Sequence, residues 1–182
     1  IIQNHAIVCN KHYAIVKGKY MSTNVGNQNL SEPIIRKKIL TAKNDASCKT
    51  VINFGEFGQG ILDEPKEHGG SGMGPSPLHG LLGTLCGCES VTFHRAAKEM
   101  NFNYNSLEFS AEFTIDIRGR MGVRSVVPHF KTVRMEVLVD TNETESKLSE
   151  VVIETEARCP VYNLINDAGV KIETQWLIKA KK

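Results

Sequence analysis

The sequence predicts an α+β domain with a mostly antiparallel sheet, and three observations lead to this fold class. Apolar and polar residues alternate over Leu107–Ile117, which is the pattern of a strand with one wet face, and a second strand is predicted over Phe130–Val139. The mostly apolar stretch that begins at Leu78 has the character of a buried helix. Strand and helix patterns occur in separate blocks, which favours α+β over an alternating α/β fold.

The composition is typical of a globular chain of one domain. The 182 residues include 22 basic and 20 acidic ones, with a formal net charge of +2. This near balance excludes a disordered charged tail and argues against binding of nucleic acid or of an anionic membrane, since such proteins concentrate positive charge. No apolar run approaches the ~20 residues that span a bilayer, and the first residues lack a signal-peptide pattern.

The cysteines indicate thiols rather than disulfides or metal ligands. There are five, an odd number, in a chain large enough to fold without cross-links, which favours a reducing, cytoplasmic compartment. No pair of Cys-x-x-Cys motifs is present, so we expect no structural zinc, and we expect no other metal or cofactor.

The N-terminal third gives only short patterns. A strand is predicted over residues 12–21, and Ser31 with Pro33 has the pattern of a helix start that leads into the apolar and basic residues up to Leu40. The sequence leaves the structure of residues 1–50 open, as an N-terminal segment of the same domain as residues 51–182.

A hairpin and a long loop are expected next. Thr50–Phe54 and Gly58–Leu62 resemble two short strands around a turn. Asp63–Pro77 is dense in glycine and proline and cannot hold a helix or a strand. It is either a linker or a functional loop, and Ser76 followed by Pro77 is a strong signal that a helix begins there.

The helix that follows is expected over Leu78–Met100. Its first half is apolar on all sides, and it contains Gly80, Gly83 and Gly87 although each glycine costs ~1 kcal/mol in a helix interior. Close approach of another helix or backbone is the expected compensation. We therefore predict a long central helix that packs tightly, against its own symmetry mate in a homodimer.

The remaining elements are predicted in chain order. Residues 119–128 form a loop between the two strands, and a helix over Thr141–Arg158 begins with Thr141 or Asn142 as its cap. This helix ends at Cys159, because the residue before a proline avoids the helical region. A last strand is predicted over Val170–Lys179.

Cys88 is a candidate nucleophile on the evidence of its position. It lies in the third turn of the helix that the glycine and proline loop introduces, and Arg95 lies two turns further on the same face. A guanidinium group nearby would favour the reactive thiolate. The alternatives are that Cys88 is an inert core thiol, as most buried cysteines are, and that Arg95 is a solvated surface residue.

Two separated motifs resemble those of the OsmC/Ohr family, the osmotically inducible and organic hydroperoxide resistance proteins. The first consists of Asp63-Glu64-Pro65, Gly69-Gly70, Gly74-Pro75-Ser76-Pro77, Leu81-Leu82 and Gly87-Cys88. In that family a cysteine follows the loop proline at eleven positions, as Cys88 follows Pro77. The second is Cys159-Pro160-Val161-Tyr162-Asn163, which fits a C-P-x-x-N segment. The resemblance covers roughly residues 50–180.

This resemblance implies an intertwined homodimer with thiol peroxidase activity. Cys88 would attack an organic hydroperoxide and become a sulfenic acid, and Cys159 would condense with it to a disulfide. An external dithiol, for example of the lipoyl type, would then restore the enzyme. Sites in this family form between subunits.

The sequence also departs from the efficient peroxidases of the family. They place a glutamate directly after the loop proline, paired with an arginine from the N-terminal region. Here Leu78 occupies that position, and no nearby glutamate is expected to replace it. Arg36 is the only arginine in the first fifty residues, and Arg95 and Arg158 are the other candidates for activating the thiol.

Three functions therefore compete. The first is a slow thiol-dependent peroxidase with Cys88 and Cys159 as its catalytic residues. The second is a non-enzymatic dimer that binds a small apolar ligand between its subunits. The third is a structural dimer in which the cysteines only fill the core.

Overall fold

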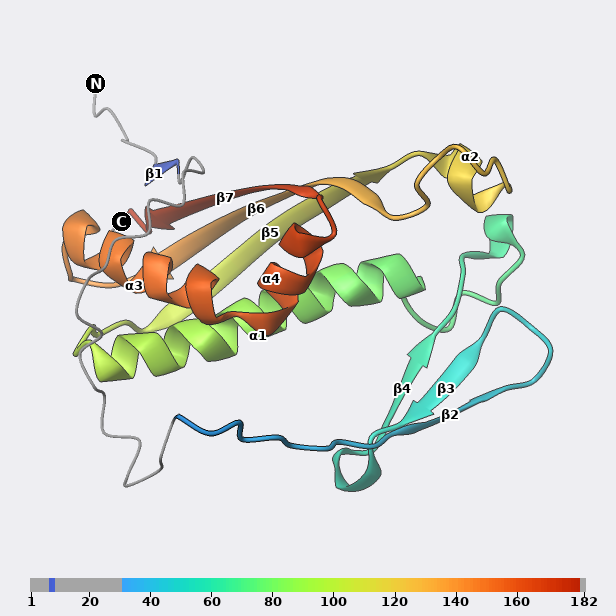
Figure 1. The fold of residues 1–182 in the computed structure, drawn as a ribbon, viewed down its shortest axis with the longest axis horizontal. Helices are drawn as coiled ribbons and strands as arrows, with labels where there is room; N and C mark the ends of the chain where they lie inside the picture. The colour runs from blue at the N-terminus through green and yellow to red at the C-terminus, as the bar shows by residue number, and fades with distance from the viewer. Residues whose placement is uncertain (1–6, 9–30, 181–182) are drawn as a thin grey trace. The chain divides into compact units, whose positions relative to one another are not determined.

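The computed structural model describes residues 7–8 and 31–180, and these fall into two compact units (Figure 1). The smaller unit contains residues 31–81. The larger one contains residues 7–8 and 82–180. The strand predicted over residues 12–21 lies outside the described residues.

The smaller unit is built on a three-stranded antiparallel sheet. Its strands are β2 (Thr41–Asn44), β3 (Thr50–Asn53) and β4 (Gln59–Leu62), in that order. A single 3₁₀ turn, η1 (Gly55–Phe57), joins β3 to β4, with Thr50 opposite Leu62 in the ladder. The predicted hairpin is confirmed, whereas β2 was not predicted.

The helix predicted from Ser31 is wrong. Residues 33–40 form neither helix nor strand, and every side chain from Ser31 to Leu40 is exposed. A short helix is marginal in water unless one of its faces packs against something. Since no such packing exists here, the local start signal at Ser31 is not sufficient.

The glycine and proline segment after β4 is an ordered loop, not an unstructured linker. It contains one 3₁₀ turn, η2 (Lys66–His68). The carboxylate of buried Asp63 accepts hydrogen bonds from the Ser71 hydroxyl at 2.6 Å, from the Ser71 and Met73 amides at 3.1 Å each, and from the Glu64 amide at 2.8 Å. A Cβ at Gly70 would lie only 1.7 Å from the Glu64 carbonyl oxygen, so this turn requires glycine.

The larger unit contains a four-stranded sheet in the order β1-β7-β6-β5, with β1 (Ile7–Val8), β5 (Ser106–Ile115), β6 (Phe130–Asp140) and β7 (Lys171–Ile178). β5 and β6 are antiparallel, whereas β6 and β7 are parallel. Along β5 the burial alternates residue by residue, as its sequence predicts. The α+β class is confirmed.

The connection between β5 and β6 differs slightly from the prediction. Ile117 does not extend the strand but begins a short helical turn, α2 (Ile117–Arg120). The Asp116 carboxylate caps this turn by accepting a hydrogen bond from the Arg118 amide at 3.1 Å. The loop that follows leads to β6.

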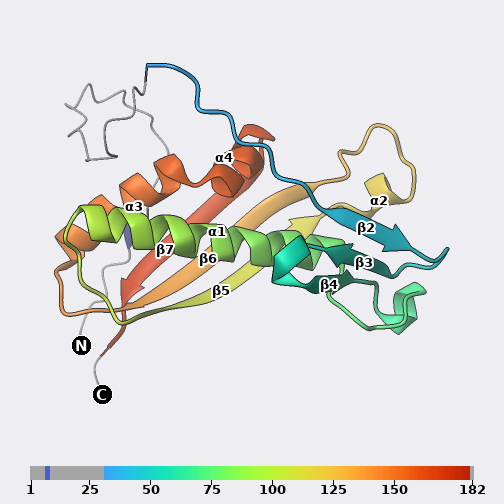
Figure 2. The ribbon, with the colours of Figure 1, turned by 90° about the horizontal axis from the view of Figure 1, so that it is seen from below.

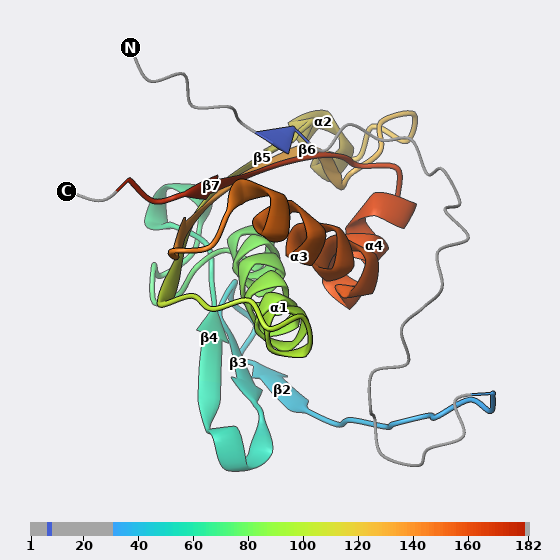
Figure 3. The same cartoon turned by 90° about the vertical axis from the view of Figure 1, so that its left-hand side faces the viewer.

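Three helices cover one face of the sheet in the larger unit (Figure 3): α1 (Pro77–Glu99), α3 (Glu145–Arg158) and α4 (Pro160–Asp167). Figure 2 shows α1 and α3 along the strands. The aromatic centre of this core is Trp176, which stacks on Phe93 with ring centroids 5.0 Å apart. Fully buried aliphatic side chains from α1, β6 and α3 surround it, among them Leu85, Val133, Val137 and Leu148.

The start of α3 differs from the prediction, and the chain after its end contains a helix that was not predicted. Its N-cap is Thr144, whose hydroxyl accepts from the Lys147 amide at 3.3 Å, and neither Thr141 nor Asn142 takes that place. Cys159 ends the helix as predicted, in an extended conformation. The unpredicted α4 begins immediately afterwards and completes the crossover that a parallel pair such as β6 and β7 requires.

The helix predicted from Leu78 is observed as α1, and Ser76 precedes its first residue as expected. The Ser76 hydroxyl accepts from the His79 amide at 3.4 Å. However, the first half of α1 is not buried on all sides within one chain, since Leu81, Gly83, Thr84 and Gly87 are exposed. This exposed row bears on the oligomeric state.

Candidate active site around two cysteines

The fold brings Cys88 and Cys159 together although 71 positions separate them in the sequence. Cys88 lies on α1, half-buried, and Cys159 lies fully buried at the junction of α3 and α4. The Cys88 side chain is close enough to act on the Cys159 thiol by hydrogen bonding. Both cysteines are free thiols.

The C-P-x-x-N segment explains how Cys159 is held. The side-chain amide of Asn163 donates to the carbonyl oxygens of Glu156, at 2.9 Å, and of Cys159, at 2.8 Å. The Glu156 carbonyl lies at the end of α3 and has no helical partner, because residue 160 is a proline without an amide hydrogen. The Cys159 carbonyl also accepts from the backbone amide of Asn163, at 3.0 Å. Pro160 then starts α4 in the first helical position, which suits a residue without an amide hydrogen. The motif therefore fixes the backbone on both sides of Cys159.

The surroundings of Cys159 keep its thiol protonated. Burial is the largest cause that raises its pKa, and the neighbouring Glu89 and Cys88 raise it further. Only the Tyr162 amide, which donates to Cys159 Sγ at 3.5 Å, lowers it. Since a thiolate is the attacking form of a cysteine, Cys159 needs a group that takes its proton.

Glu89, which directly follows Cys88 on α1, is the acid that faces Cys159. Its side chain is fully buried, and neither carboxyl oxygen makes a regular hydrogen bond among the described residues. Burial raises the pKa of Glu89 to about 7, the Cys159 thiol lowers it, and the charge of Glu156 raises it. The Glu89 carboxyl group thus changes its charge near neutral pH.

The sequence-based expectation that no nearby glutamate serves this helix is therefore incomplete. Leu78 does replace the glutamate after the loop proline, but Glu89 supplies a different carboxyl group beside the cysteines. The signal was present in the sequence: Glu89 is the one acidic residue in the otherwise apolar stretch from Leu78 to Phe93. An acid at such a position is unusual unless it is paired or functional.

A second buried carboxyl group, that of Glu156 on α3, lies behind Glu89. It accepts a hydrogen bond from the Thr174 hydroxyl on β7. Burial raises its pKa, whereas the hydrogen bond from Thr174 and the nearby polar groups of Trp176 and Tyr162 lower it. Glu156 therefore has a hydrogen-bond donor of its own, whereas the carboxyl oxygens of Glu89 have none among the described residues.

Neither candidate arginine of the larger unit, Arg95 or Arg158, is paired with the two thiols. Arg158 is adjacent to Cys159 in sequence, but its guanidinium makes a two-pronged ion pair with Glu99, at 2.6 and 3.0 Å. Arg95 is exposed, and its charge also acts on Glu99. Arg36 is exposed in the smaller unit. Neither Arg95 nor Arg158 is among the groups that shift the pKa of Cys159 or Glu89.

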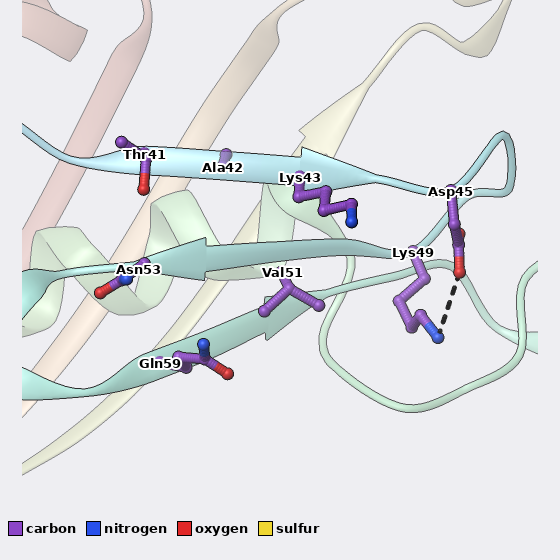
Figure 4. Close-up of a pocket in the computed structure, with 8 residues that line it drawn as sticks. All are labelled: Thr41, Ala42, Lys43, Asp45, Lys49, Val51, Asn53 and Gln59. Carbon is purple, nitrogen blue, oxygen red and sulfur yellow. Dashed lines mark ion pairs between the residues drawn. The ribbon is translucent and has the colours of Figure 1, made fainter.

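Two open hollows on the described surface lack this chemistry. One, of about 450 Å³, lies over the three-stranded sheet of the smaller unit (Figure 4). It is lined mostly by polar side chains together with Ala42 and Val51, and Lys49 and Asp45 form an ion pair of 3.5 Å there. The other, of about 440 Å³, lies beside α2, where Asp116 pairs with Arg118. Neither is lined by a cysteine.

Neither a metal-binding cluster nor a membrane-spanning helix is found among the described residues. Within residues 7–8 and 31–180, no three histidine, cysteine or acidic side chains are placed to hold a metal ion. No helix in the same residues has both the length and the apolar character that a bilayer crossing requires.

Comparison with known proteins gives a consistent result. A family model described as OsmC-like protein matches residues 69–175. No curated protein matches the chain. Among solved structures, an OsmC-like protein from Mycoplasma pneumoniae is 19% identical, with a TM-score of 0.70 over 81% of this chain and 100% of that one.

Two further similar structures carry functional names. The organic hydroperoxide resistance protein OsmC from Legionella pneumophila is 15% identical, with a TM-score of 0.56 over 81% of this chain and 100% of its own. The organic hydroperoxide resistance protein OhrB of Bacillus subtilis is 16% identical, with a TM-score of 0.54 over 79% and 98%. At such identities the likeness shows a shared fold.

Proposed function

The chain belongs to the OsmC-like protein family, and from that premise we propose that it is a thiol-dependent peroxidase that reduces organic hydroperoxides. Two of its structural neighbours are named organic hydroperoxide resistance proteins, which supports this substrate class. The observation that carries the proposal is the meeting of Cys88 and Cys159, two free thiols from distant parts of the chain.

The chemistry assigns one role to each thiol. The Cys88 thiolate attacks one oxygen of the hydroperoxide, the O–O bond breaks, and the alcohol leaves, so that Cys88 becomes a sulfenic acid. Cys159 then attacks the Cys88 sulfur, an S–S bond forms, and water leaves. An external dithiol, for example a lipoyl group, reduces the disulfide and is itself oxidised. The half-exposed Cys88 suits the first step and the buried Cys159 the second.

The proposal includes a homodimer in a cytoplasmic, reducing compartment and a low turnover. The low turnover is expected because Leu78 replaces the family glutamate and because Arg158 is engaged by Glu99. Loss of one positioned polar partner commonly costs ~10²–10³ in rate. Arg36, Arg95 and Arg158 stay candidates for activating Cys88 in the assembled protein.

One observation favours the alternative of a non-enzymatic dimer that binds a small apolar ligand between its subunits. Next to Cys88 on α1, Gly87 has no atom within 4 Å of the position that its Cβ would take. Open space beside an apolar helix face could receive a ligand as well as a second chain. Turnover measurements separate the two functions.

The test follows the thiols of the reduced protein after one equivalent of cumene hydroperoxide under anaerobic conditions. We expect loss of two thiols and a Cys88–Cys159 disulfide in the mass map. Cys88→Ser should abolish turnover with a dithiol, since the nucleophile is gone. Cys159→Ser should stop at one stoichiometric sulfenic acid on Cys88. Cys86→Ser, two residues away on the same helix, is the matched control and should turn over as the wild type does.

Unchanged turnover by Cys88→Ser would refute the mechanism. Binding of a small apolar ligand would then be the preferred function. Oxidation confined to Cys9 or Cys48 would refute the assignment of the two cysteines.

A further inference from the structure

We propose that Glu89 is the general base of the second half-reaction: it takes the proton of the Cys159 thiol and delivers it to the oxygen that leaves the Cys88 sulfenic acid. This inference rests on the proposed function and adds to it a residue outside the glutamate and arginine pair expected from the family resemblance. It concerns only the step that forms the disulfide.

The position of Glu89 is the first observation that supports this role. Glu89 follows Cys88 directly on α1, and its buried carboxyl group faces the thiol of Cys159. Both of its oxygens lack a regular hydrogen bond among the described residues. A buried carboxyl group without partners is costly, so its presence here needs a reason. Proton exchange with the buried thiol beside it is such a reason.

The charges around Glu89 and Cys159 are the second observation that supports this role. The groups that act on Glu89 are the Cys159 thiol at the α3–α4 junction and the carboxyl group of Glu156 on α3, while Thr174 and Trp176 of β7 and Tyr162 of α4 reach Glu156. None of them is a cation. A thiol in such surroundings cannot become a thiolate by charge stabilisation, so it must pass its proton to a neighbouring base. Glu89, with its pKa raised to about 7, can both accept and release a proton near neutral pH.

The step balances with the groups present. Ionised Glu89 removes the proton from Cys159, whose sulfur attacks the sulfur of Cys88. The S–O bond breaks, and the departing hydroxide takes the proton from Glu89 to give water. Glu89 returns to its ionised form, and the products are one disulfide and one water from one sulfenic acid and one thiol.

The experiment measures the attack of Cys159 in two ways, in a background where Cys9, Cys48 and Cys86 are serine. In the first arm, cumene hydroperoxide forms the Cys88 sulfenic acid, and the rate of disulfide formation is followed by rapid quench and mass analysis. In the second arm, Cys88 is converted to the mixed disulfide with thionitrobenzoate, and release of the coloured thiolate by Cys159 is followed. The second arm needs no peroxidase activity.

We expect Glu89→Gln to slow both rates about 10²-fold at neutral pH, which is the usual scale of general base catalysis. The sulfenic acid should therefore accumulate in the first arm. In the wild type both rates should rise with pH around 7, and Glu89→Gln should lose that rise. Glu150→Gln, which removes an exposed carboxylate of α3, is the control and should match the wild type.

Glu156→Gln provides an independent check, because it removes the charge that raises the pKa of Glu89. Its rate profile should rise at lower pH than that of the wild type. Equal rates and equal pH profiles for Glu89→Gln and wild type would overturn the role of Glu89. If hydroperoxide leaves Cys88 unoxidised, the peroxidase proposal fails, and the mixed-disulfide arm still decides the role of Glu89.

Discussion

Asp63 and Glu89 are both buried carboxyl groups, yet their pKa values move in opposite directions. Asp63 accepts four hydrogen bonds, and that from the Ser71 hydroxyl is the largest cause that lowers its pKa to about 2. The Glu89 carboxyl group makes no regular hydrogen bond within the described part of the chain, and burial raises its pKa to about 7. The first group is ionised and organises a loop, whereas the second can change its charge near neutral pH. Hydrogen bonding decides which role a buried acid has.

Stability should therefore depend on pH through Glu89. Below its ordinary pKa of 4.5 the carboxyl group is protonated in both the folded and the unfolded chain, so burial costs no charge. Between pH 4.5 and about 7 only the unfolded chain releases the proton, and stability falls as pH rises. We expect Glu89→Gln to gain up to about 3 kcal/mol of unfolding free energy over the wild type between about pH 4 and pH 8.

Urea unfolding of both proteins at the two pH values measures this difference. A gap between the wild type and Glu89→Gln that does not change with pH would show that Glu89 is not titrating in the folded protein. Glu150→Gln serves as the exposed control and should show little pH-dependent gain.

At the scale of elements, the junction between α3 and α4 is the feature on which the site depends. A helix end normally leaves carbonyl groups without partners, and here the side-chain amide of Asn163 donates to that of Glu156 while α4 starts at once. The junction also provides the crossover between the parallel strands β6 and β7. One short motif thus ends a helix, begins the next, and places a cysteine between them.

We expect Asn163→Ala to destabilise the protein by about 1–3 kcal/mol, since it leaves the half-buried carbonyl of Glu156 without its side-chain donor and removes one of the two donors to the Cys159 carbonyl. Disulfide formation should slow as well, because Cys159 loses its fixed position. Asn166→Ala on the same helix is the comparison, since its side-chain oxygen makes no hydrogen bond among the described residues. Equal stability losses for the two variants, measured by thermal unfolding, would remove the special role of Asn163.

For the whole molecule, the open face of α1 is the main indication of a second chain. Leu81 and Val91 are 38% and 52% exposed, and Gly83 and Gly87 between them meet no atom within 4 Å of a Cβ position. Gly80, in contrast, is closely packed, since its Cβ would lie 2.9 Å from Leu62 Cδ2. Glycines that cost helix stability, and whose Cβ positions meet no other side chain among the described residues, favour a close partner.

We therefore predict a homodimer at micromolar concentration, with an interface of more than ~2,000 Å² in total, as is typical of permanent dimers. Gly83→Leu tests the face directly. In a single chain the leucine meets open space and should stabilise the helix by up to about 1 kcal/mol. In a dimer packed through α1 it should clash and weaken association.

Sedimentation of the wild type and of Gly83→Leu distinguishes these outcomes. A monomeric wild type would contradict the predicted homodimer. A dimer that Gly83→Leu leaves intact would place the interface on another face. A substitution at Ala97, which is buried on the same helix, is the contrast to Gly83→Leu. A larger residue at Ala97 should destabilise the single chain as well.

The sequence alone determined the elements whose evidence is local. The alternation along β5, the start of α1 at Ser76 and Pro77, and the end of α3 at Cys159 all depend on neighbouring residues, and all are confirmed. The motif resemblance also identified the family correctly. The domain boundary at residue 50 stays a prediction.

Only the tertiary structure decided what depends on contacts between distant residues. The start signal at Ser31 produced no helix, since residues 31–40 are exposed to solvent in the described part of the chain, and α4 forms the crossover between β6 and β7 together with α3. Glu89 appeared in the sequence as one acid in an apolar helix. Its meaning depends on Cys159, seventy positions away, since burial and a facing thiol are what shift its pKa. Periodicity records which face of an element is apolar, but not which distant side chain that face meets.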